Sequence, residues 1–183
     1  QLGRTRRADL TGTGRRAPRT LADVADLHPG VAILAPLVGT WVGEGSGEYP
    51  TIEPFTYREE LTIGHTGKPF LTYAQRTAGP DGRPLHAETG YLRVPAPGRI
   101  ELVVAQPTGI TEVDEGTLSI AGAVIDIVVD ATSIGLTASA KDVTALSRSF
   151  HLDGDDLAYT VRMAAVDQPL KHHLAAVLRR RPQ

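Results

Sequence analysis

Two adjacent histidines near the end of the sequence, His172 and His173, are the side chains best suited by type to bind a metal. They lead into the apolar run LAAVL, which three arginines follow. The neutral imidazole is the commonest metal ligand in proteins. Neighbouring side chains of an extended strand point to opposite faces, so a strand here would send only one of the two imidazoles into an interior. A chelate formed by both histidines is therefore disfavoured.

The segment that follows the histidines has two interpretations. If His173 faces inward on a strand, Ala175 and Val177 share its face and form a floor of small side chains. One imidazole above such a floor suits a flat macrocycle, which needs a single axial ligand and room for its plane. Alternatively, HHLAAVLRRR forms a C-terminal helix whose arginines interact favourably with the helix dipole. The residues alone leave both interpretations open.

The remaining residue types narrow the possible chemistry. The sequence contains no cysteine, which excludes disulfides, thiolate metal sites and a cysteine nucleophile. It contains no HExxH or GxSxG motif, and its carboxylates lack the pairing expected of a glycosidase. His65, His86 and His151 occur singly in strand or hairpin contexts. We interpret these three as surface residues or as partners in local hydrogen bonds.

The segment GTWVGEG places Gly39, Gly43 and Gly45 around Trp41. Glycines within a strand permit strong coiling and close approach of the backbone. A single tryptophan at the start of such a strand is suited to fill one end of a barrel, because it buries a large apolar area. The spacing differs from the GxGxxG of dinucleotide-binding proteins, and no strand–helix unit follows it. The segment therefore predicts a structural role.

From Gly39 onward the sequence predicts about ten short strands separated by turn sequences such as Pro80-Asp81-Gly82 and Asp153-Gly154-Asp155. Tyr57, Glu59 and Leu61 alternate onto one face of one such strand. No helical segment lies between the strands, which indicates an antiparallel meander. A sheet of this size closes on itself because closure removes its exposed edges, and the closed barrel encloses room for one ligand. The expected strands cover residues 39–47, 54–65, 69–77, 85–94, 99–107, 110–120, 123–132, 142–152, 156–166 and 172–180.

The composition indicates one domain preceded by an arm. The chain has 183 residues, and its 19 basic residues nearly balance its 21 acidic ones, so neither nucleic acid nor a membrane is an expected partner. Residues 1–26 are rich in arginine and poor in apolar side chains, and we expect them to form a disordered arm before a domain at 27–183. TLADVADLH predicts a short helix that starts after Thr20 and ends at Pro29-Gly30. The arm lacks the apolar core of a secretory signal, and a cytoplasmic location is expected.

Several segments resemble, in the same order, those of the nitrobindins, a family of small haem proteins with a barrel like that of the fatty-acid-binding proteins. The resemblance runs from about Leu27 to Arg180 and is strongest to the single-domain members of actinobacteria. It includes the family's G-x-W-x-G-x-G motif, formed here by Gly39, Trp41, Gly43 and Gly45. The other matching segments are YPTIEPFTYREEL, GKPFLTY, LHAETGYLR, SAKDVTALSRSF and QPLKHHLAAVL.

The resemblance implies a ten-stranded antiparallel up-and-down barrel that holds one haem b per subunit. It places the axial iron ligand at His173, leaves His172 pointing away, and places Lys141 beside the haem, where its charge neutralises a propionate. The second ring nitrogen of His173 then needs an acceptor, which the sequence does not identify. Family members are described as converting peroxynitrite to nitrate at ferric haem and as binding nitric oxide when the haem is reduced. The implied function is a peroxynitrite isomerase with small-molecule partners and with a homodimer as one option.

Two alternative functions stay open. One is a module that stores, senses or carries nitric oxide or haem without turnover. The other is a carrier of fatty acids or lipids, because those barrels share a Gly-x-Trp near their first strand. In the haem interpretation we expect Phe70, Leu71 and Ile110 to line the cavity, on a side without strong hydrogen-bond donors and without a distal histidine.

Overall fold

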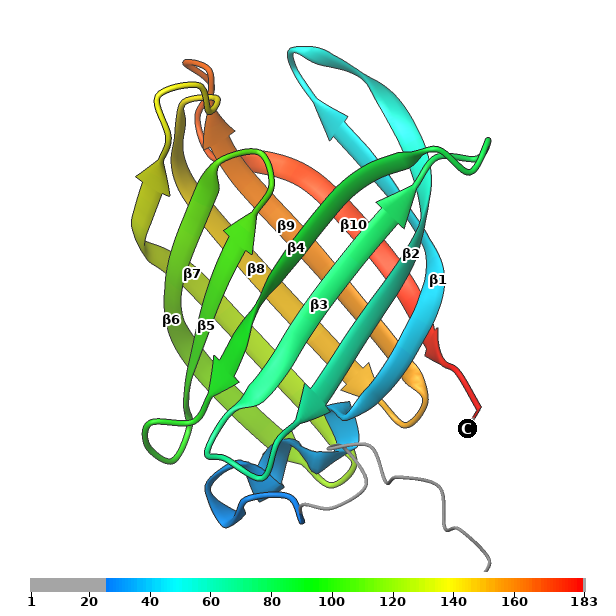
Figure 1. Ribbon diagram of the computed structural model, residues 1–183, viewed down its shortest axis with the longest axis vertical. Coiled ribbons are helices and arrows are strands. Elements are labelled where there is room, and N and C mark those ends of the chain that lie inside the picture. The colour runs from blue at the N-terminus through cyan, green and yellow to red at the C-terminus, as the bar shows by residue number, and fades with distance from the viewer. Residues whose placement is uncertain (1–25, 183) are drawn as a thin grey trace, which may run out of the picture.

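The protein is a closed barrel of ten antiparallel strands in which each strand pairs with its neighbours in sequence and the last pairs with the first (Figure 1). The computed structural model describes residues 26–182, so the expected arm, apart from Asp26, lies outside the described residues. The predicted all-β, ten-stranded up-and-down barrel is confirmed. The strands are β1 (Gly39–Tyr49), β2 (Ile52–His65), β3 (Leu71–Ala78), β4 (Pro84–Arg93), β5 (Arg99–Gln106), β6 (Ile110–Ala121), β7 (Val124–Leu136), β8 (Val143–Asp153), β9 (Asp156–Ala165) and β10 (Lys171–Arg180).

The alternation of apolar and polar residues accounts for the strands and their faces. Tyr57, Glu59 and Leu61 of β2 are all buried, as their alternation predicts, and the residues between them are more exposed. Apart from the end of β7, which continues to Leu136, the strand bounds agree with the expected ones to within about two residues. The alternative of a C-terminal helix is wrong, because Lys171–Arg180 is a strand that pairs with both β1 and β9.

A 3₁₀ helix, η2 (Pro29–Leu37), covers one end of the barrel (Figure 1). The predicted helix does not reach Pro29-Gly30, because Asp26 to His28 are not helical; Pro29-Gly30 instead begin η2, since proline's fixed φ suits the first helical position. The ring Nδ1 of His28 caps the helix by accepting a hydrogen bond from the amide of Gly30 at 3.0 Å. The greater part of the predicted helix, Thr20 to Ala25, lies outside the described residues.

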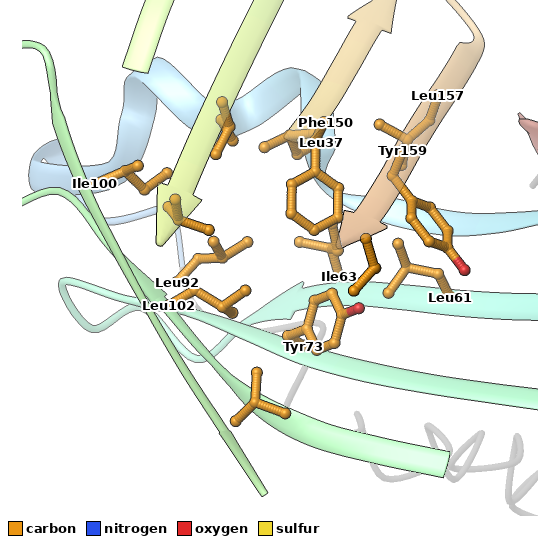
Figure 2. Close-up of a cluster of buried hydrophobic side chains, with 14 of the residues drawn as sticks. Leu37, Leu61, Ile63, Tyr73, Leu92, Ile100, Leu102, Phe150, Leu157 and Tyr159 are labelled. Atoms are coloured by element: carbon orange, nitrogen blue, oxygen red, sulfur yellow. The ribbon is translucent and has the colours of Figure 1, made fainter. Parts of the chain in front are cut away.

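Trp41 lies fully buried beneath η2 and fills this end of the barrel, as predicted. Its indole Nε1 donates a hydrogen bond to the carbonyl oxygen of Leu37 at 2.9 Å. The guanidinium of Arg180, from the end of β10, lies 4.1 Å from the centre of the indole ring and adds a cation–π contact. Figure 2 shows part of the apolar core, in which Leu37 of η2 lies near side chains from several strands, including Leu61 and Leu157.

The glycines of β1 allow close packing inside the barrel. A Cβ atom on Gly43 would lie 2.1 Å from the carbonyl oxygen of Val177 on β10, and one on Gly45 would lie 2.3 Å from the ring of Tyr57 on β2. Neither contact is possible for a larger residue without moving the neighbour. The motif therefore has the structural role that its sequence predicts, and it leaves room for the Tyr57 ring across β1.

Within residues 26–182, no helix combines the length and the apolar character that crossing a bilayer requires.

Removing the indole tests the role of Trp41 in closing this end. We expect Trp41→Ala to lower the free energy of unfolding by about 3–5 kcal/mol, because it leaves a large cavity and removes the hydrogen bond to Leu37. Urea unfolding followed by far-ultraviolet circular dichroism measures this change, since the variant loses the only tryptophan as a fluorescent probe. Val177→Ala, at a position that is 63% exposed, is the control and should change stability by less than about 0.5 kcal/mol. A loss below about 1 kcal/mol for Trp41→Ala would contradict the assigned role.

Candidate functional site

A cavity of about 710 Å³ lies inside the barrel toward the end opposite η2. Its wall includes the loop between β3 and β4, which places its mouth at that end. Phe55, Leu146, Val161 and Leu174 give it a largely apolar lining. The volume lies within the range of about 300–1,000 Å³ that is typical of small-molecule sites.

His173 lines this cavity from the beginning of β10. Its Nδ1 lies 3.1 Å from the carbonyl oxygen of Glu48 on β1, and its ring meets that of Tyr49 edge-on at 5.4 Å between centroids. A carbonyl oxygen only accepts hydrogen bonds, so Nδ1 carries the hydrogen. Burial lowers the pKa of His173, and the charges of His172, His86 and Lys141 act in the same direction. The imidazole is therefore neutral, with its lone pair on Nε2.

A β-bulge directs His173 into the cavity. His172 pairs with Arg162 of β9, and the next paired residue is Leu174 with Val161, so His173 is an extra residue in the ladder. A bulge of one residue shifts the inward face by one position, and here both His173 and Leu174 line the cavity.

The expectation that Ala175 and Val177 share the inward face of His173 is wrong. Beyond the bulge the buried residues are Ala176 and Leu178, while Val177 is exposed. The reason is the register shift, since a slip of one residue moves every following side chain to the other face. His172 is exposed and lies in a depression on the outer surface, so it points away from the cavity as expected.

Lys141 is exposed in the loop between β7 and β8, at the same end of the barrel as the cavity mouth. It does not line the cavity, but its charge contributes to the lowered pKa of His173. Its expected contact with a propionate stays a prediction.

The expected lining residues are only partly right. Ile110 lines the cavity. Phe70 and Leu71 do not, because they stand at the start of β3, which lies at the end of the barrel that η2 covers. There Phe70 packs edge-on against Tyr91 with centroids 5.2 Å apart, and Leu71 is fully buried in the core.

His86 also lines the cavity, although its sequence context did not reveal it. The expectation that the cavity has no such histidine is therefore wrong, whereas the interpretation of His86 as a surface residue or local partner is not contradicted, since His86 is partly exposed and lies beside Glu88. Its Nε2 lies 3.7 Å from a carboxylate oxygen of Glu88, which is buried. The alternation of β4 was the available signal, because His86, Glu88, Gly90 and Leu92 occupy every second position and share the inward face.

A cluster of buried charges surrounds Arg148 beneath the cavity. Its guanidinium donates to Glu88 at 2.8 Å and to Glu112 at 2.9 Å, and the hydroxyl of Tyr73 also donates to Glu88 at 2.8 Å. Burial raises the pKa of Glu88, but the charge of Arg148 and the hydrogen bonds outweigh it and hold that pKa at about 2. Glu88 is therefore ionised throughout the physiological range.

Two other interior carboxyls behave in the opposite way. Burial raises the pKa of Glu59 to about 7, against hydrogen bonds that it accepts from Tyr159 at 2.5 Å and from Gln75 at 2.8 Å. Burial, with the charge of Glu112, raises the pKa of Asp114 to about 7. Neither carboxylate oxygen of Asp114 has a hydrogen-bond partner in the described part of the chain.

Comparison with known proteins identifies the family. Residues 30–180 match the family model described as "THAP4-like, heme-binding beta-barrel domain". The chain belongs to this family. The resemblance to the nitrobindins is thereby confirmed, and it covers nearly the whole described region.

Individual relatives of this nitrobindin-family chain match over most of their length. It is 64% identical over 156 residues to "Peroxynitrite isomerase 1" of Mycolicibacterium paratuberculosis, which covers 85% of this chain and 97% of the relative. It is 60% identical over 155 residues to "Peroxynitrite isomerase" of Nocardia farcinica, covering 84% and 92%. The crystal structure of Rv2717c from M. tuberculosis superposes with a TM-score of 0.84 at 55% identity, covering 86% of this chain and all of that one.

The raised pKa of Asp114 predicts a pH-dependent cost to stability. At pH values between the ordinary carboxyl pKa and about 7, Asp114 is protonated in the folded state but ionised in the unfolded state. The folded state therefore binds more protons, and the free energy of unfolding falls as the pH rises. One pKa unit corresponds to about 1.4 kcal/mol, and we expect Asp114→Asn to raise the free energy of unfolding by about 2 kcal/mol or more at pH 8.

Urea unfolding of the haem-free protein at pH 4 and pH 8 measures this effect, and the gain should be small at pH 4. Asp153→Asn, an exposed position, is the matched control and should give no gain at either pH. An Asp114→Asn gain that is equal at both pH values would show that Asp114 does not titrate as described.

Proposed function

We propose that the protein binds one haem b per subunit through Nε2 of His173 and isomerises peroxynitrite to nitrate at the ferric haem. The observation that carries this proposal is the neutral imidazole of His173, held inside the cavity with its Nδ1 directed to the carbonyl oxygen of Glu48. Metal-binding histidines commonly donate their second ring nitrogen to a backbone carbonyl in this way. Glu48 thus supplies the acceptor that the sequence did not identify.

The residues present fit haem better than a bare metal ion. Across residues 26–182, no three histidine or carboxylate side chains gather as ligands for an ion. A porphyrin supplies four nitrogen ligands of its own, so haem binding would need one donor from the protein and an apolar slot. His173 is that donor, and Phe55, Leu146 and Val161 contribute to the slot.

The chain's own residues then have defined tasks. His173 presents the lone pair of Nε2, Glu48 fixes its tautomer, and the ring of Tyr49 restrains the plane of the imidazole. The apolar walls exclude water from the bound substrate. Lys141 at the rim neutralises a propionate, which contributes at most about 1 kcal/mol at an exposed position. When bound, the haem would supply the iron that polarises the ligand and exchanges electrons with it. This chemistry belongs to the cofactor.

The named relatives support the activity, since proteins 60–64% identical to this chain over most of its length are called peroxynitrite isomerases. Binding of nitric oxide to the reduced haem is part of the same proposal, because a haem held by a single histidine would have capacity for a further ligand. A protein that binds haem or nitric oxide without turnover would use the same site. Only measurement of the reaction product distinguishes such a protein from an isomerase.

The charges inside the barrel argue against a fatty-acid carrier. A fatty-acid carboxylate needs a cation that is free to bind it. Arg148 is the buried basic side chain of the described region, and it already contacts Glu88 and Glu112. An added carboxylate would enter an interior in which acids outnumber this arginine.

Hemin titration tests the assignment of the ligand. Adding hemin to the protein should produce a Soret band that saturates at one equivalent. His173→Ala should abolish the band of the bound form, because it removes the axial donor, whereas His172→Ala should leave it unchanged because His172 is exposed. Equal loss in both variants, or retention in His173→Ala, would contradict the assignment.

Rapid mixing with peroxynitrite tests the activity. The ferric haem-loaded protein should speed peroxynitrite decay and raise the yield of nitrate relative to nitrite, and His173→Ala should do neither. Stopped-flow absorbance gives the rate, and anion chromatography gives the products. If the nitrate yield does not rise with haem-loaded protein, the isomerase assignment fails while nitric oxide binding survives.

A further inference from the structure

His86 stands on the wall of the cavity that faces His173. In the closed strand order, β4 is four strands from β10 in one direction and six in the other, so the two strands lie on nearly opposite sides of the barrel. Both histidines line the same cavity. If His173 held a haem iron, His86 would stand on the facing wall of the cavity, where a ligand that enters could meet it.

A buried carboxylate lies beside His86. The Nε2 atom lies 3.7 Å from Oε2 of Glu88, whose side chain is only 2% exposed. Glu88 cannot turn away, because Arg148 donates to both of its oxygens, at 2.8 and 3.1 Å, and Tyr73 donates to one of them. The backbone of His86 is also held, since its amide donates to Oγ1 of Thr77 at 3.1 Å.

This arrangement favours one of the two ring nitrogens as the proton acceptor. A carboxylate beside Nε2 favours the tautomer with the hydrogen on Nε2, which leaves the lone pair on Nδ1. A buried carboxylate also stabilises the imidazolium that forms when Nδ1 is protonated, as in carboxylate–histidine pairs that act as general bases. The charged groups that share this cavity with His86 are Glu88, Arg148, Asp81 and Arg83, and His173 lies across the cavity.

We propose that His86 is the proton acceptor for weakly acidic ligands that enter the cavity, including peroxynitrous acid, the protonated form of peroxynitrite. The O–H bond of the acid breaks, its electron pair stays on the ligand anion, and the proton moves to Nδ1 of His86. The anion is then free to bind the metal, and the proton returns to water after the product anion leaves. This inference rests on the proposed haem function and adds a catalytic role for a residue outside the haem ligand.

Cyanide is a suitable probe, because at neutral pH it is present mainly as hydrogen cyanide and must lose its proton to bind iron as the anion. We expect His86→Leu to slow the association of cyanide with the ferric haem-loaded protein by at least tenfold. Nitric oxide carries no proton, and its association should change by less than about threefold. Stopped-flow absorbance in the Soret region measures both rates.

Two further variants sharpen the test. Glu88→Gln keeps the shape of the side chain but removes its charge, and it should slow cyanide without slowing nitric oxide. His151→Leu is the matched control, because that imidazole also contacts a carboxylate, Asp126 at 2.6 Å, but on the outer surface; it should change neither rate. Unchanged cyanide association in His86→Leu, or equal slowing of both ligands, overturns the proposal.

A measurement on the haem-free protein gives an independent readout. Nitrogen-15 NMR of the imidazole side chains should show His86 with its hydrogen on Nε2, and Glu88→Gln should weaken that preference. Hydrogen found on Nδ1 instead would overturn the proposal. If the wild-type protein fails to bind hemin, the proposed function fails together with this inference; if it binds hemin but cyanide association is insensitive to His86, only this inference fails.

Discussion

The hydrogen bond from Nδ1 of His173 to the carbonyl oxygen of Glu48 joins two strands, β10 and β1, that are 125 residues apart in the sequence. These strands form the seam at which the first and last strands close the barrel. The acceptor is a backbone atom, so its position depends on the sheet itself and not on a side-chain rotamer. If the seam opens, His173 loses the contact that keeps its lone pair on Nε2. The single tautomer of this imidazole, on which the proposed haem ligation rests, thus depends on closure of the barrel.

The bulge at His173 lies in the pairing of β10 with β9 and allows both His173 and Leu174 to line the cavity. A regular strand alternates its side chains, so an inward imidazole would force Leu174 outward and would also reverse the faces of Ala176 and Leu178. The extra residue lets His173 enter the cavity while Leu174, Ala176 and Leu178 keep their inward positions. Bulges are common beside functional sites for this reason.

The interior of the barrel consists of three layers along its axis. The apolar core around Trp41 fills the end under η2, the charged cluster around Arg148 lies beyond it, and the cavity occupies the open end. Buried ion pairs seldom stabilise a fold more than well-packed apolar side chains would, because removing charges from water is costly. A layer of this kind is better explained by what it does for the cavity. It holds Glu88 ionised beside His86 and so gives the cavity one polar wall.

The local pattern of the sequence was sufficient to predict the strands, the barrel and the structural role of Trp41. Period-two alternation and turn residues depend on a few neighbouring positions, as in Tyr57, Glu59 and Leu61, and these are visible in one dimension. His173 and Lys141 came from the resemblance to a family, since two adjacent histidines in a strand do not by themselves reveal which one faces inward.

Tertiary structure decided the faces after the bulge, the acceptor of His173 and the composition of the cavity wall. Ala175 and Val177 were assigned to the wrong face because a bulge forms between partner strands and leaves no local signal. Phe70 and Leu71 were placed in the cavity because an apolar inward position looks the same at either end of a barrel. His86 lies beside Glu88 on the same strand, but Glu88 is held in place by Arg148, which is 60 residues further along the chain and meets it only when the sheet forms. Local sequence determined which side chains face inward along the regular strands, whereas the bulge determined the faces beyond His173 and closure of the barrel determined which inward residues meet.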